Sequence, residues 1–172
     1  MAEEILEGQK CPMCGQDSLT LMETSRDIPS FGEVFIFSMD CGNCDYHKAD
    51  VEPADKKESS KYTMDVNSEN DMEVRIVKSS SATIKIPHMF TMEAGPTANG
   101  YVTNIEGVLN RVKHQLQASR EEEEDKSAKD KAKRMLKKLQ RVMWGQDSLK
   151  LIVEDPEGNS AIVSEKAKVT KL

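Results

Sequence analysis

The chain has 172 residues, of which 37% are hydrophobic and 31% are charged, and its formal net charge is -6. An acidic chain lacks the basic field of a typical nucleic-acid-binding domain, so only local basic patches remain for such a role. No apolar run approaches the roughly 18 residues of a membrane span, and the start Met1–Glu4 lacks the features of an export signal. We therefore expect a cytoplasmic protein without a membrane anchor.

All four cysteines fall into two C-x-x-C motifs, Cys11-Pro12-Met13-Cys14 and Cys41-Gly42-Asn43-Cys44. Two such turns can place four thiolates about 2.3 Å from a zinc ion with little strain. The spacing between the motifs is longer than the common one of roughly 15–20 residues, so it does not select a zinc family. Local disulfides or a redox pair are the alternatives, but nothing indicates an oxidising compartment. We predict one structural zinc ion held by Cys11, Cys14, Cys41 and Cys44.

Two strands are predicted between the cysteine motifs, over Leu19–Thr24 and Gly32–Met39. Ile28–Gly32 forms the bend between them, because Pro29 fixes φ and cannot donate to a central ladder. The apolar run Val34–Phe37 does not alternate, which indicates a strand covered on both faces.

Three phenylalanines, Phe31, Phe35 and Phe37, belong to this segment. A small zinc module cannot bury all three by itself, so either the rest of the chain covers them or a partner does. Internal packing of all three is one interpretation, because aromatic side chains dominate cores as well as interfaces. Phe31, at the bend, is our candidate for a partner contact.

From Glu52 to Lys61 the composition becomes too polar to bury a face, which predicts a linker or an exposed crossing. We therefore divide the chain into a zinc-ribbon finger over residues 1–51, a linker over 52–61 and a second domain over 62–172. The linker composition also predicts that loss of the metal unfolds the finger and spares much of the second domain.

The second domain is predicted to begin with strands at Val74–Val77 and Ala82–Pro87, because both runs alternate. The serines 79–81 between them could bind a ligand through their hydroxyls, but we interpret them as a solvated turn. Near the C-terminus, Ser148–Glu154 and Ser160–Val163 flank the turn formers 155–159, and this pattern predicts a β-hairpin.

A helical hairpin is predicted over about 103–143, between these groups of strands. Thr103 and Glu106 match the S/T-x-x-E capping box of a helix start, and the acidic block Glu121–Asp125 marks the connection. Apolar residues recur at helical spacing in two stripes, which we expect to pack on a sheet. The stripes are Ile105, Val108, Leu109, Val112 and Leu116, then Ala128, Ala132, Met135, Leu136, Leu139, Val142 and Met143.

The second helix is densely basic and has a single acid, Asp130. Its cations are Lys126, Lys129, Lys131, Lys133, Arg134, Lys137, Lys138 and Arg141. This face can bind RNA, an acidic protein or the neighbouring acidic block Glu121–Asp125, but such a run is usually a solvated face. No aromatic residue interleaves with the lysines to stack on bases. Lys133 and Lys137 are the candidate contacts here.

Motifs for catalysis are missing from the sequence: there is no phosphate loop, nucleophile elbow or histidine-bearing metal motif. His88 and His114 stand alone and are interpreted as surface residues. We expect a protein that is not an enzyme.

Three segments of the finger together resemble the zinc finger of the ZPR-type family. They are Cys11-Pro12-x-Cys14-Gly15, Ile28-Pro29-x-Phe31-x-Glu33-Val34 and Cys41-x-x-Cys44-x-Tyr46. Three more, within Val77–Pro87, Gly100–Gly107 and Asp155–Ser160, are similar to the A-domain signatures of the same family. The chain carries one finger and one A-domain, as the archaeal branch does, whereas eukaryotic members carry two such modules in tandem.

The resemblance implies a mainly β fold with an α insertion. It comprises a four-cysteine zinc ribbon like that of translation initiation factor 2 beta, then a double-stranded β-helix that carries the helical hairpin. Family members resemble chaperones for translation elongation factor 1-alpha, which implies a chaperone or adaptor for that factor. The alternative is a nucleic-acid-associated zinc-ribbon protein that acts in translation or transcription through the finger and the basic helix.

Overall fold

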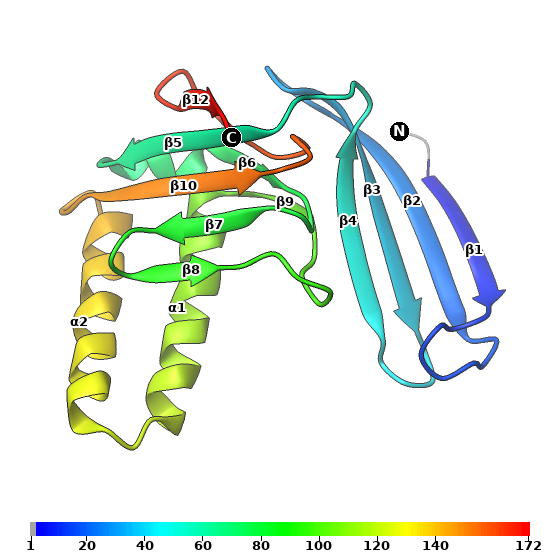
Figure 1. Ribbon diagram of the computed structural model, residues 1–172, viewed down its shortest axis with the longest axis horizontal. Coiled ribbons are helices and arrows are strands. Elements are labelled where there is room, and N and C mark those ends of the chain that lie inside the picture. Colours follow the sequence, from blue (N-terminus) through cyan, green and yellow to red (C-terminus); the bar gives the residue numbers. More distant parts are fainter. Residues whose placement is uncertain (1–2) are drawn as a thin grey trace.

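A computed structural model describes residues 3–172 and shows a mainly β protein with two long helices (Figure 1). The finger is a four-stranded antiparallel sheet in chain order. Its strands are β1 (Glu3–Gln9), β2 (Leu19–Ile28), β3 (Gly32–Cys41) and β4 (His47–Pro53). The predicted central pair is confirmed, and it is longer than expected, running from Leu19 opposite Cys41 to Ile28 opposite Gly32. The outer strands β1 and β4 were not predicted.

The second domain contains two antiparallel sheets, of five strands in the order β12-β5-β10-β7-β8 and three in the order β11-β6-β9. The strands are β5 (Ser60–Val66), β6 (Arg75–Lys78), β7 (Thr83–Ile86), β8 (Phe90–Met92), β9 (Tyr101–Asn104), β10 (Leu149–Asp155), β11 (Ala161–Val163) and β12 (Lys168–Lys171). A short 3-10 helix, η1 (Glu69–Glu73), joins β5 to β6. Antiparallel strands divided between two sheets in this way form the expected double-stranded β-helix, or jelly roll.

The predicted C-terminal hairpin is wrong, although both of its strands exist. β10 pairs with β5 and β7, whereas β11 pairs with β6 in the other sheet. The turn formers after β10 therefore carry the chain across from one sheet to the other. The same holds for β6 and β7, which lie in different sheets on either side of the serine run. A short turn between two alternating runs looks the same in the sequence whether the two strands pair with each other or lie in different sheets. The sequence therefore could not distinguish a hairpin from a crossing between sheets.

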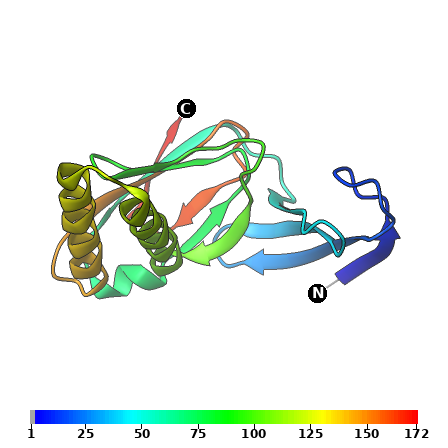
Figure 2. The ribbon, with the colours of Figure 1, turned by 90° about the horizontal axis from the view of Figure 1, so that it is seen from below.

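The helical hairpin consists of α1 (Ile105–Glu122) and α2 (Lys126–Met143), packed against each other at the end of the molecule away from the finger (Figure 2). The apolar stripe of α1 is fully buried, as predicted, and α2 buries Leu139 and Val142. The predicted capping box is wrong by one residue. Thr103 belongs to β9, opposite Ile76, and Asn104 is the N-cap, with its side-chain oxygen accepting from the Gly107 N–H at 2.8 Å.

The main core lies between the two sheets and the hairpin. It is built from β5, β7 and β10 of one sheet, β6 and β11 of the other, and the buried stripes of the helices. Aliphatic side chains such as Ile84, Leu109 and Leu151 are its centre, each no more than 1% exposed.

A second, smaller cluster joins the finger to the jelly roll. Ile28, Val34 and Val51 of the finger pack against Val77 and neighbouring side chains of the three-stranded sheet. Ala49 adds two hydrogen bonds across the boundary, one accepted from the Gly100 N–H at 2.8 Å and one donated to the Asn99 side chain at 3.0 Å. Residues 54–59, between β4 and β5, form neither helix nor strand. The two units therefore share an apolar interface as well as this connection.

Candidate functional site

The four cysteines meet at the end of the finger that lies away from the jelly roll. Cys11 and Cys14 come from the turn between β1 and β2, whereas Cys41 ends β3 and Cys44 follows in the next turn. Their four sulfur atoms all lie within 4.8 Å of one another. The Cys11–Cys44 and Cys14–Cys41 sulfur pairs are each 3.7 Å apart. Cysteines far apart in the sequence are thus brought into one cluster.

The two cysteine turns have matching backbone geometry. Gly15 and Asp45 each follow the second cysteine of their motif and are left-handed, with φ of 72° and 56°. In each turn the first cysteine's sulfur accepts a backbone N–H from two residues on, at 3.4 Å. Glycine and aspartate are among the residues that tolerate this conformation best, so the sequence suits both turns.

This geometry fits a tetrahedral zinc ion. Four sulfurs at about 2.3 Å from a common centre are about 3.8 Å apart, close to the separations observed. The hydroxyl of Ser18 lies 3.2 Å from the Cys41 sulfur. This contact, with the Asn43 N–H, lowers the pKa of Cys41 to about 6 and favours the thiolate that binds metal. The four cysteines form a site for one structural zinc ion, as predicted.

His47 does not join the cysteines. It is exposed, and its Nδ1 lies 2.6 Å from a carboxylate oxygen of Asp40. His88 and His114 are also exposed, so the interpretation of both as surface residues is confirmed.

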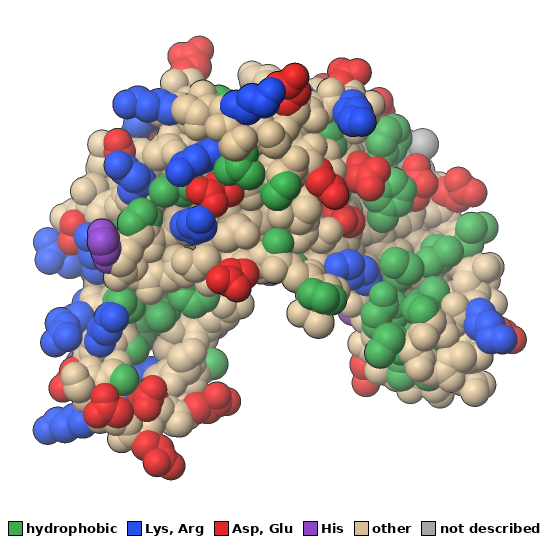
Figure 3. Space-filling model, in the orientation of Figure 1, with side chains coloured by type: hydrophobic (Ala, Val, Ile, Leu, Met, Phe, Trp, Pro, Cys, Tyr) green, Lys and Arg blue, Asp and Glu red, His purple; other side chains and the backbone are tan. Residues whose placement is uncertain are grey.

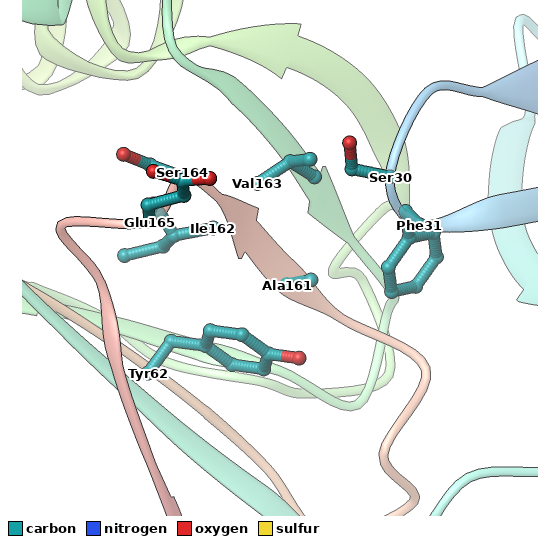
Figure 4. Close-up of a pocket in the computed structure, with 8 residues that line it drawn as sticks. All are labelled: Ser30, Phe31, Tyr62, Ala161, Ile162, Val163, Ser164 and Glu165. Carbon is teal, nitrogen blue, oxygen red and sulfur yellow. The ribbon is translucent and has the colours of Figure 1, made fainter.

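Phe31 lies at the turn between β2 and β3, where the finger meets the jelly roll. It packs against the interdomain cluster, and the ammonium of Lys57 sits 3.4 Å from the centre of its ring. The ring also borders a pocket of about 450 Å³, drawn in Figure 4, with Tyr62 and β11 on the other sides. Phe31 is therefore half-buried between the two units, with one edge facing this pocket.

Phe37 lies on the face of the finger sheet opposite to the one that Val34 and Val51 bury against the jelly roll. With Leu6, Leu21 and Met39 it lines a mainly apolar hollow of about 470 Å³ over β1 to β3. We call these four residues the open face. Figure 3 shows hydrophobic side chains gathered over the finger, and Leu6 is 48% exposed. Leu6 was missed from the sequence because β1 reads Glu-Glu-Ile-Leu-Glu and shows no alternation.

Lys133 and Lys137 lie one turn apart on α2 and are both exposed. Neither forms an ion pair within the part of the chain that the structure describes. The hairpin and the finger stand as two arms on either side of a hollow in Figure 3, so these lysines and the open face belong to different arms.

The serine run was interpreted wrongly, because Ser79 is buried. Its hydroxyl donates to the Asp155 carboxylate at 2.7 Å, and Ser81 and Ser160 donate to the same group at 2.9 and 2.6 Å. Asp155 is fully buried and ends β10. Burial raises the pKa of this carboxyl, but these hydrogen bonds outweigh it and hold the pKa below its usual value. These hydrogen bonds connect the segment between β6 and β7 to the segment between β10 and β11, which are the two places where the chain crosses between the sheets.

No helix in residues 3–172 is long and apolar enough to cross a membrane.

Two family profiles match the chain in the same order as its two units. The ZPR1 zinc-finger domain matches residues 4–59, and the ZPR1 jelly-roll domain matches residues 70–171.

Relatives with this architecture are found in archaea. An uncharacterized ZPR1-like protein of Methanocaldococcus jannaschii is 38% identical over 157 residues, covering 90% of this chain and 79% of the relative. A second, from Pyrococcus horikoshii, is 38% identical over 167 residues, covering 94% and 75%. The zinc finger chaperone zpr1 of Schizosaccharomyces pombe is 30% identical over 156 residues, covering 88% of this chain but 33% of that protein.

Proposed function

Because the chain belongs to the ZPR1 zinc-finger family, we propose that it is a zinc-stabilised chaperone or adaptor for translation elongation factor 1-alpha in the cytoplasm. It acts by binding rather than by catalysis. The Schizosaccharomyces pombe relative is called a chaperone, and this chain corresponds to about one third of it. A single module therefore supplies one binding unit where the longer relative has room for two.

The open face carries this proposal. One face of the finger sheet is covered by the jelly roll through Val34 and Val51, which are completely buried. The other face keeps an aromatic and several aliphatic side chains partly exposed around a hollow. Exposed apolar patches of this kind, especially with charged residues such as Glu4 and Glu23 at the rim, mark protein-binding surfaces.

Phe31 remains our second candidate contact, at the pocket between the finger and the jelly roll. Its ring edge is available there, but its packing and the Lys57 ammonium already hold it. Phe37 lacks such a partner and has the hollow in front of it. We therefore expect Phe37 to contribute more binding energy than Phe31.

The test is the affinity of the purified zinc-loaded chain for elongation factor 1-alpha from the same organism. We expect Phe37→Ala to weaken binding at least tenfold, because buried aromatic anchors dominate interface energies. Val169→Ala is a matched control, since Val169 is 57% exposed on β12 of the other unit. Equal affinities for the wild type and Phe37→Ala would move the contact away from the open face.

The basic helix supports the alternative, nucleic-acid binding. If RNA is the partner, Lys133→Gln with Lys137→Gln should weaken RNA binding, and the affinity should fall steeply with salt. A chain that binds RNA in this way but fails to bind elongation factor 1-alpha would overturn the chaperone proposal in favour of the alternative.

A further inference from the structure

Lys78 is a buried cation in the jelly roll. It ends β6 and is 1% exposed. Its ammonium donates to the backbone carbonyls of Ser79 and Asn99, at 3.0 and 3.2 Å. No carboxylate of residues 3–172 approaches this nitrogen within 4.0 Å. The centre of the Tyr101 ring lies 5.5 Å from the nitrogen. An ammonium has three donors, so two carbonyls leave one N–H without an oxygen acceptor in residues 3–172.

The two acids whose charges act on Lys78 already have their own hydrogen bonds. Asp50 accepts the backbone N–H of Ser80 at 2.7 Å and also the hydroxyl of Ser80. Asp155 is held by the three serine hydroxyls described above. Burial lowers the pKa of Lys78, the charges of Asp50 and Asp155 offset this only in part, and Lys48 and Arg111 lower it further. Two acids and two further cations thus act on the Lys78 ammonium, and both acids already accept hydrogen bonds from serines.

A pocket of about 400 Å³ lies in front of Lys78. Arg111 and Gln115, one turn apart on α1, form one wall, and the exposed loop 93–99 forms another. The guanidinium of Arg111 lies 4.1 Å from the centre of the Tyr101 ring and forms no ion pair with any described residue. The one acid in the lining, Glu93, is exposed on the loop.

We infer that the pocket of Lys78, Arg111 and Gln115 binds the phosphate group of a small phosphate ester. Lys78 supplies a point charge with one N–H that neither carbonyl accepts, and Arg111 supplies the planar fork that binds phosphate oxygens in pairs. Two lining cations match a phosphate dianion better than a single carboxylate. The cavity is larger than one phosphate group, so it has room for the organic part of the ligand. This site is independent of the open face and of elongation factor 1-alpha.

The test is a titration of the 15N-labelled, zinc-loaded chain with inorganic phosphate, GMP and acetate at constant ionic strength. We expect saturable shifts of the Gln115 side chain and of the loop 93–99 amides with phosphate, tighter binding of GMP, and no saturation with acetate. Arg111→Gln should weaken phosphate binding about tenfold. Arg120→Gln is the matched control, because Arg120 is an exposed cation in the last turn of the same helix.

Three results would overturn the inference. They are unsaturable shifts spread over all basic surfaces, equal affinity of wild type and Arg111→Gln, and acetate binding as tight as phosphate. Lys78→Met serves as a second variant, to be interpreted only if its spectrum stays folded. The Arg111→Gln comparison decides the matter even if Lys78→Met unfolds.

Discussion

The finger and the jelly roll are both antiparallel β structures, but they are held together differently. The jelly roll encloses a continuous apolar core between two sheets and a helical hairpin. The finger is a single sheet, and its fully buried side chains fall into two small groups at opposite ends. One group surrounds Cys11 and Cys41, and the other is shared with the jelly roll.

This difference shows where each unit obtains its stability. A single sheet cannot bury enough apolar surface on its own, so the finger depends on the metal at one end and on its neighbour at the other. The same shortage leaves one face of the sheet available to a partner. The jelly roll builds its main core from its own side chains.

Removal of the zinc ion should have the largest effect. Structural zinc contributes on the order of 10–16 kcal/mol of apparent binding free energy in small fingers, so Cys41→Ser should unfold the finger. Metal analysis should fall from about one zinc per chain to near zero, and NMR signals of β1 to β4 should collapse. Signals of the core around Leu109 should persist.

The interdomain cluster limits how far the two units are independent. Val77 of the jelly roll has no exposed surface, and finger side chains provide part of its covering. Its NMR signals should therefore shift when the finger unfolds. Full unfolding of the jelly roll in Cys41→Ser would show that the two units form one cooperative structure.

The same substitution made in each unit sharpens the comparison. Leu109→Ala removes a side chain with no exposure and should cost about 2–5 kcal/mol of unfolding free energy. Leu6→Ala lies on the open face at 48% exposure and should cost about 0.5 kcal/mol or less. Urea denaturation of both variants measures this. Similar losses would mean that the open face is packed in solution, by a second copy or another segment.

The sequence predicted those features that repeat with a fixed spacing. The two C-x-x-C turns led to the zinc site because four thiolates at these positions have few other uses. The apolar stripe of α1 was identified in full because its five members follow one helical face. Both patterns are local, so they require no knowledge of which strands are neighbours.

Features that depend on strand pairing could not be predicted in the same way. Asp155 looks like a turn residue in the sequence, and its role appears only when Ser79, 76 positions away, is brought beside it. Lys78 reads as a surface lysine before a serine run, although the loop before β9 covers it. Both residues lie at crossings between sheets, where the sequence resembles an ordinary hairpin.

The Asp155 network should make the jelly roll sensitive to acid. The pKa of Asp155 is lowered in the folded state, so its contribution is present above the unfolded value of about 3.9. It is lost as the pH falls through the lower folded value. Asp155→Asn should cost about 1–3 kcal/mol near neutral pH and remove this part of the acid dependence. Asp65→Asn, at an exposed position on β5, is the control. Identical stability-against-pH curves for the wild type and Asp155→Asn would contradict this account.

The smallest expected effect concerns the start of α1, where the sequence and the structure differ by one residue. The Asn104 oxygen accepts the Gly107 N–H at 2.8 Å, so Asn104→Ala should cost about 0.5–2 kcal/mol in thermal or urea unfolding. Thr103→Ala should cost less, because Thr103 is the last but one residue of β9 and does not act as the cap. Since both residues are half-buried, the pair is matched for exposure. A larger loss from Thr103→Ala than from Asn104→Ala would restore the capping box read from the sequence and place the helix start one residue earlier.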